Sequence, residues 1–119
     1  MAKLGELERQ VMDVLWGAGS ETMTVRTVVA SFPDHAYTTL LTVLDRLAAK
    51  GLVHRTMVGR AYQYAAAATR EDYTSSLLHE VLAETTDARA ALVRFAETIS
   101  DEEAAHLRDA LDEARTNRP

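Results

Sequence analysis

Threonines and cations share one side of a predicted helix between Ala36 and Val53. Successive helical residues are about 100° apart, which brings these side chains together. They are Thr38, Thr39, Thr42, Arg46 and Lys50, and Asp45 and Ala49 lie on the same side. A solvated face usually carries Glu, Lys or Gln, which favour a helix more than threonine does. Short hydroxyl and methyl groups suit base edges, and Arg and Lys suit phosphates or guanine, so the pattern predicts a DNA-contacting face.

The opposite side of this stretch is apolar, as expected for a helix that packs on a core. Its members are Leu40, Leu41, Val43, Leu44, Leu47 and Ala48. Gly51 can adopt the left-handed conformation that ends a helix, with Leu52 packing back. A plainer interpretation of the threonine side stays open, because three threonines occur in one helix by chance and some can bond to the preceding turn.

Other chemistry has little support in the sequence. The chain contains no cysteine, which excludes disulfides, thiol catalysis and thiolate metal sites. Glu103 and His106 are one turn apart and His79 lies on another predicted helix, but a solvated face explains them equally well. There is no glycine-rich phosphate loop and no catalytic triad. We therefore predict no metal, no cofactor and no enzymatic activity.

Charge is unevenly distributed along the chain. The net charge is −5, but residues 1–68 carry seven Lys and Arg against six Asp and Glu, whereas residues 69–119 carry six against twelve. No acidic residue lies between Arg46 and Arg70. A local basic patch matters more to a phosphate backbone than the global sum, so the first part of the chain remains compatible with nucleic acid.

Two shorter predicted helices precede the threonine-bearing one. An amphipathic helix begins near Leu4 and stops near Gly17 and Gly19. Thr24 can cap a second helix, which Pro33 ends. Two short helices, a tight turn and a third helix with a polar outer face indicate a helix-turn-helix.

A hairpin is predicted directly after the third helix. Residues 53–58 and 61–65 alternate around Gly59-Arg60, which suits a two-residue turn. Arg55 and Arg60 can point outward as phosphate contacts or as solvated turn residues, while Tyr62 and Tyr64 should pack on the helices. Met23 can add a short third strand. These elements together predict a winged helix.

The remaining chain predicts three helices with thin apolar stripes. Thr69, Asp87 and Ser100 can cap them. Such stripes cannot build a good core alone, so we expect a second copy to cover them, although an intramolecular core stays open. The expected dimerisation residues are Leu77, Val81, Leu92, Phe95, Leu107 and Leu111.

The fold class is therefore mainly α with a small β-hairpin. We expect an N-terminal winged helix-turn-helix at 1–67 and a C-terminal helical dimerisation region at 68–119. No apolar run approaches the roughly 18 to 20 residues of a membrane span, and the first residues carry charges where a signal peptide is apolar. These features predict a cytoplasmic protein.

Three segments resemble the penicillinase-repressor family, BlaI/MecI. They are LGELERQVMDVLW at 4–16, AYTTLLTVLDRLAAKGLV at 36–53 and GRAYQY at 59–64. The resemblance implies a homodimeric bacterial repressor bound to a dyad operator with TACA/TGTA half-sites near β-lactamase or related genes. Copper-responsive relatives carry a C-terminal cysteine cluster, which this chain lacks.

The resemblance also bears on release from DNA. Family repressors that answer to a membrane sensor are cut at an Asn-Phe bond, and the matching place here is Arg94-Phe95. Phe95 fits and Arg94 does not, because a pocket shaped for a short amide should reject a long cation. We therefore predict slow cleavage there and release through another site, protease or signal.

Two other functions remain open at this stage. A winged helix can serve as a protein-interaction module, since the fold alone does not decide function. A small-molecule-responsive regulator of similar architecture is the other alternative, which a pocket between the dimerisation helices would favour.

Overall fold

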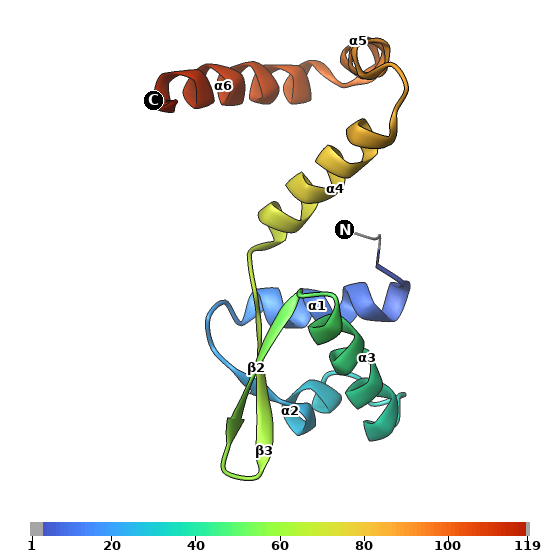
Figure 1. Ribbon diagram of the computed structural model, residues 1–119, viewed down its shortest axis with the longest axis vertical. Helices are drawn as coiled ribbons and strands as arrows, with labels where there is room; N and C mark the ends of the chain where they lie inside the picture. Colours follow the sequence, from blue (N-terminus) through green and yellow to red (C-terminus); the bar gives the residue numbers. More distant parts are fainter. Residues whose placement is uncertain (1–3, 119) are drawn as a thin grey trace. The chain divides into compact units, whose positions relative to one another are not determined.

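The computed structural model describes residues 4–118 (Figure 1). The chain divides into two compact units, one ending at Glu80 and one beginning at Val81. None of the helices in the described chain is long and apolar enough to cross a membrane. The mainly helical architecture with one small sheet confirms the predicted fold class.

Three helices open the first unit in the predicted order. They are α1 (Glu6–Gly17), α2 (Val25–Ala30) and α3 (Tyr37–Ala49). The hydroxyl of Thr24 accepts a hydrogen bond from the N–H of Thr27 at 3.1 Å, so the predicted cap of α2 is confirmed. The apolar sides of the helices form the core, whose fully buried members include Val11, Met12, Leu15, Val28, Leu40, Leu44 and Leu47.

The end of α3 follows from its glycine. Gly51 has a φ of 77°, which residues with a Cβ rarely adopt. Its N–H donates to Ala48 O at 3.0 Å, and the N–H of Leu52 donates to Leu47 O at 3.0 Å. This pair of bonds satisfies carbonyls that the helix end would leave without partners. The chain consequently turns sharply from α3 into the hairpin.

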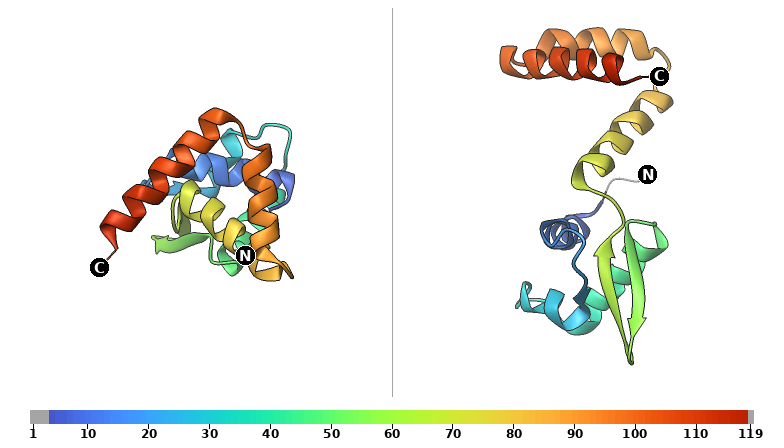
Figure 2. Two further views of the ribbon diagram at one scale, coloured as in Figure 1. Left: turned by 90° about the horizontal axis from the view of Figure 1, so that it is seen from above. Right: turned by 90° about the vertical axis from the view of Figure 1, so that its left-hand side faces the viewer.

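The sheet has three strands in the order β1-β3-β2. Strand β1 (Met23–Thr24) pairs with β3 (Ala61–Ala66), which pairs with β2 (Val53–Val58). Val58 lies opposite Ala61, so Gly59 and Arg60 form the predicted two-residue turn, with Gly59 at a φ of 64°. Figures 1 and 2 show the hairpin lying beside α3, as in a winged helix.

The two wing tyrosines differ in burial. Tyr64 is fully buried, as predicted, whereas Tyr62 remains 38% exposed. Tyr62 lies nearer the turn of the hairpin, opposite Met57, which is itself exposed. The alternation of the strand predicted the shared side of the tyrosines but not how far the helices extend along it.

Three further helices follow, α4 (Arg70–Glu84), α5 (Ala88–Thr98) and α6 (Asp101–Asn117). The side chains of Asp87 and Ser100 cap α5 and α6 as predicted. The division between the two compact units falls after Glu80, within α4, and not between β3 and α4. The expected functional boundary between residues 67 and 68 stays a prediction.

Candidate nucleic-acid interface

The outer face of α3 presents its threonines to solvent. Thr38, Thr39 and Thr42 are all exposed. The hydroxyl of Thr42 donates to the carbonyl of Thr38 at 2.9 Å, which is the backbone bond that the plainer interpretation anticipated. That bond uses the hydroxyl hydrogen only, so the Thr42 oxygen can still accept a hydrogen bond, and the residue is exposed.

Two of the predicted cations are exposed without an ion pair. Among residues 4–118, no salt bridge involves Arg46 on α3 or Arg60 at the hairpin turn. Arg46 lines a shallow depression together with Thr39 and Thr42. A threonine face beside an uncommitted guanidinium can approach a base edge and a phosphate at once.

Arg55 joins the hairpin to α3. Its guanidinium lies 3.3 Å from Asp45 Oδ1 on α3 and 4.6 Å above the ring of Tyr62. Burial raises the pKa of the Tyr64 hydroxyl, and the charge of Asp45 raises it further, while Arg55 opposes both. The Arg55 side chain is 43% exposed, so a phosphate can still reach it while it holds the hairpin against α3.

Lys50 is engaged with α1. Its Nζ lies 2.7 Å from Glu8 Oε2, and the two side chains are 36% and 15% exposed. Glu8 Oε1 also accepts the N–H of Gly5 at 3.0 Å. The hydrogen bonds from Lys50 and then from Gly5 hold the pKa of the Glu8 carboxyl below its ordinary value. Lys50 therefore fastens the end of the recognition helix in this structure.

Sequence reasoning assigned no role to Asp45 or Glu8. Asp45 was visible on the polar side of the predicted helix, but its partner depends on where β2 passes. Glu8 had a recognisable signal, since it stands three residues after the helix-starting Gly5 and closes a capping arrangement. Arg26 on α2 is a further exposed cation of the first unit that the charge pattern did not single out.

The predicted dimerisation residues carry exposed apolar surface. In the described part of α4, α5 and α6, no residue is buried. The exposed fractions are 62% for Val81, 50% for Leu92, 52% for Phe95, 42% for Leu107 and 56% for Leu111. Leu77 is half-buried. Exposed apolar side chains in such number are typical of an interaction surface, and the predicted dimerisation role of these residues stays a prediction.

Arg94 and Phe95 lie in the interior of α5. The hydroxyl of Thr98 donates to both of their carbonyls, at 3.2 Å to Arg94 and 3.1 Å to Phe95. A protease binds its substrate extended, so this turn must unwind before the bond can be cut. The structure thus adds a local barrier to the mismatch at Arg94.

Carboxylates and histidines do not converge in the described chain. No group of three or more of these residues could hold a metal ion within residues 4–118. Glu103 is occupied by the cap of α6, where it accepts the N–H of Ser100 at 3.0 Å. His106 instead faces Glu102, with 3.7 Å between Nε2 and Oε1.

The fold and this face together define a class of protein. A helix-turn-helix flanked by a hairpin wing, with hydroxyls and guanidinium groups on its third helix, is the architecture of winged-helix DNA-binding regulators.

Comparison with known proteins agrees. The family model for the penicillinase repressor matches residues 4–113. Two Mycobacterium tuberculosis proteins named Transcriptional regulator BlaI, from strains CDC 1551 / Oshkosh and ATCC 25618 / H37Rv, are each 42% identical over 128 residues, covering 100% of this chain and 92% of theirs. The chain belongs to the penicillinase repressor family and is a transcriptional repressor, not an enzyme.

A solved structure supports the fold alone. A MarR family protein from Bacillus stearothermophilus aligns with a TM-score of 0.52 at 17% identity, covering 97% of this chain and 75% of that one.

Proposed function

We propose that the protein is a homodimer that binds a dyad operator with TACA/TGTA-type half-sites and represses β-lactamase or related cell-envelope and antibiotic-response genes in the cytoplasm. The observation that carries the proposal is the exposed threonine face of α3, flanked by the uncommitted Arg46. Each subunit would read one half-site with this face, and Arg55 and Arg60 of the wing would contact the adjacent phosphates.

Base contact and phosphate contact can be separated by mutation. Thr42→Ala and Thr39→Ala should each cost on the order of 1 to 3 kcal/mol at the operator and little on random DNA, because only base contacts discriminate sequence. Arg46→Ala and Arg60→Ala should weaken binding to every duplex and flatten the dependence of log affinity on log salt by roughly one to two units per dimer.

Fluorescence anisotropy over a salt series measures both effects. Thr116→Ala is the matched control for Thr42→Ala, because the Thr116 hydroxyl makes the same backbone bond, at 3.0 Å to Asp112 O, on α6. Equal losses on operator and random DNA for Thr42→Ala would contradict base reading. A protein that binds neither duplex at any salt concentration would instead favour the protein-interaction module.

The proposed dimer rests on the exposed apolar residues of the helices after the wing. Leu107 and Leu111 lie one turn apart on α6, so one partner helix can cover both. Leu107→Asp should yield monomers that keep the fold of the first unit but lose most operator affinity, since the second half-site is no longer held at high effective concentration.

Sedimentation velocity tests the dimer directly. His106→Asp adds the same carboxylate one residue away, at a position that is exposed and faces Glu102, and should leave the dimer intact. A full dimer for Leu107→Asp would refute this surface.

Proteolysis by a membrane sensor or another protease is the mode of release that family membership suggests. Cutting at Arg94-Phe95 would have to overcome both the cation at Arg94 and the helical turn closed by Thr98. We therefore propose that release uses another site, protease or signal. Mass measurement of the protein recovered from β-lactam-treated cells tests this, since a fragment ending at Arg94 would contradict it.

A further inference from the structure

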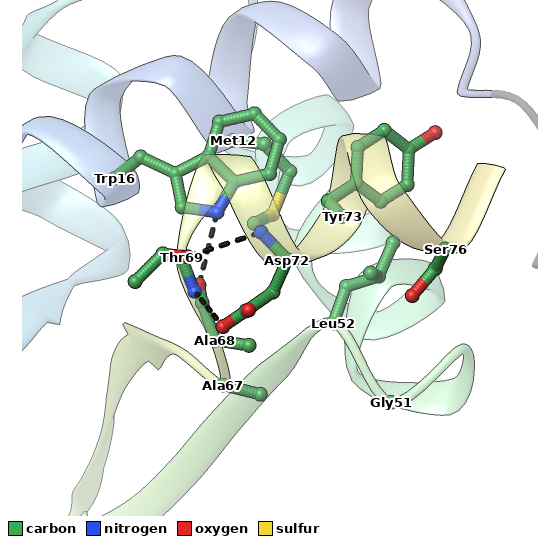
Figure 3. Close-up of a pocket in the computed structure, with 10 residues that line it drawn as sticks. All are labelled: Met12, Trp16, Gly51, Leu52, Ala67, Ala68, Thr69, Asp72, Tyr73 and Ser76. Atoms are coloured by element: carbon green, nitrogen blue, oxygen red, sulfur yellow. Dashed lines mark hydrogen bonds between the residues drawn. The ribbon is translucent and has the colours of Figure 1, made fainter. Parts of the chain in front are cut away.

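The connector between β3 and α4, residues 67–69, is fastened to α1. The indole Nε1–H of Trp16 donates to the carbonyl of Ala68 at 3.1 Å, as the close-up in Figure 3 shows. The guanidinium of Arg70 lies 3.3 Å from Asp13 Oδ1 and 5.3 Å from the centre of the Trp16 ring. Two residues of α1 thus hold both Ala68 of the connector and Arg70, the first residue of α4.

A second set of contacts holds the next turn of α4. The ring of Tyr73 lies 5.6 Å from that of Trp16, and its hydroxyl accepts the N–H of Leu4 at 3.2 Å. Thr69 and Asp72 cap the helix reciprocally, with bonds of 3.1 and 3.3 Å between side chain and backbone. We call the four side chains Asp13, Trp16, Arg70 and Tyr73 the α4 latch.

The first turns of α4 belong to the first unit and lie at the edge of its core, against which Tyr73 packs. No residue of α4 is buried in the described chain. A hollow of about 70 Å³, lined by Met12, Leu52 and Ser76 among others, remains beside the two rings (Figure 3). Docking of α4 therefore uses side chains that are not fully buried, so they can be replaced without removing a fully buried core residue.

We propose that the α4 latch is a specificity device that sets the spacing between the two operator half-sites. The inference rests on the proposed function of a dimer on a dyad operator. Helix α4 is continuous from Arg70 to Glu84, and the latch fixes the direction in which this helix leaves the DNA-binding unit. In a dimer held through later residues, that direction sets how far apart the two recognition helices lie and how they are rotated.

The geometry of DNA makes this direction measurable. Inserting one base pair between half-sites moves one of them by about 3.4 Å and rotates it by about 35° around the duplex. A latched α4 cannot follow such a change without straining its contacts, whereas an unlatched α4 can pivot at the connector. Spacing selectivity should therefore depend on residues that touch neither DNA nor the partner.

Operator duplexes with spacers altered by one and two base pairs test the proposal. The wild type should lose roughly tenfold or more in affinity for one added base pair, because the second half-site no longer gains from high effective concentration. Arg70→Ala/Tyr73→Ala should lose less than about threefold on the same change and should bind a single half-site within about twofold of the wild type. Arg70→Lys, which keeps the charge for Asp13, should lie between them.

Arg115→Ala is the matched control. Arg115 is an exposed arginine whose guanidinium lies 3.3 Å from Asp112, the same distance as in the pair of Arg70 with Asp13, but on α6. It should keep the wild-type spacing profile. Sedimentation and thermal melting should show that each variant is still a folded dimer. A variant that is only destabilised would instead dissociate or melt at a lower temperature.

A measurement without DNA tests the latch separately. Trp16 is the only tryptophan in the chain, so its fluorescence reports this contact directly. Acrylamide should quench it more strongly in Arg70→Ala/Tyr73→Ala than in the wild type, and equal quenching would overturn the latch.

The DNA outcomes separate this inference from the proposed function. A wild type that binds single and paired half-sites but ignores spacing, or a double variant with the wild-type spacing profile, would overturn the spacing role while leaving the repressor function standing. A wild type with no gain from a second half-site would overturn the proposed dimeric function and the spacing role with it.

Discussion

Replacing Glu8 with Gln should loosen the recognition helix from α1. The carboxylate makes two bonds at once, one of 2.7 Å to Lys50 Nζ and one of 3.0 Å to the N–H of Gly5. A neutral amide keeps a weaker acceptor and loses the charge that favours both the ammonium and the helix N-terminus. The perturbation therefore acts at the end of α3 without touching the exposed threonines of its outer face.

The expected cost follows from exposure. A hydrogen bond between charged groups contributes roughly 1.5 to 3 kcal/mol when protected, but Lys50 is 36% exposed, so solvent screening reduces this to about 1 kcal/mol. The charge near the helix N-terminus adds about 0.5 kcal/mol. The free energy of unfolding should fall by about 1 to 2 kcal/mol, and Tm by roughly 5 to 10 °C.

A double-mutant cycle with Lys50→Met isolates the pair. The coupling energy from thermal or urea unfolding should be about 1 kcal/mol, because each single variant already breaks the same contact. Additive effects within about 0.3 kcal/mol would refute the pairing. Lys50→Met should also leave the salt dependence of DNA binding unchanged, because Lys50 is paired with Glu8. If the slope of log affinity against log salt becomes as flat as in Arg46→Ala, Lys50 contacts a phosphate.

The same carboxylate predicts a pH dependence. The pKa of Glu8 is lowered in the folded state, so its stabilisation is present above the unfolded pKa of about 4.3 and is lost as the pH falls through the lower folded value. Unfolding free energies measured from pH 6 down to pH 2 should fall less steeply for Glu8→Gln than for the wild type. Identical slopes would show that the folded carboxyl has an ordinary pKa.

Three further predictions concern the core, the wing and the cleavage site. Leu44→Ala should cost about 2 to 5 kcal/mol of unfolding free energy, because the side chain is fully buried, and a loss below about 1 kcal/mol would contradict that burial. Gly59→Val should cost about 1 to 2 kcal/mol, because a β-branched residue is strained at a φ of 64°, with calorimetry as the check and no change as the contrary result. Arg94→Asn should speed cutting before Phe95 by an Asn-Phe-specific protease, as followed by mass spectrometry, and an unchanged rate would place the barrier in the helix and not in the cation.

Local sequence patterns were sufficient to predict helices and turns whose structure depends on residues close together in the sequence. The two faces between Ala36 and Val53 indicated a buried helix with a polar outer side, and Gly51 marked its end. Gly59-Arg60 defined the hairpin turn and its register. These features depend on side chains close in sequence, and periodicity, caps and turn residues report such neighbours directly.

Partners distant in the sequence could not be found in this way. Lys50 and Arg55 were both predicted to contact phosphates from their charge, which stays a prediction. Folding also brings Lys50 to Glu8, and Arg55 to Asp45 and Tyr62, and the sequence did not indicate these partners. The indole of Trp16 likewise bonds to Ala68, which is 52 positions away in the sequence, and holds the segment before α4 against α1. Residue type determined what each side chain can bind. Only the packing of α1 against α3 and α4, and of the hairpin against α3, decided which partner lies within reach.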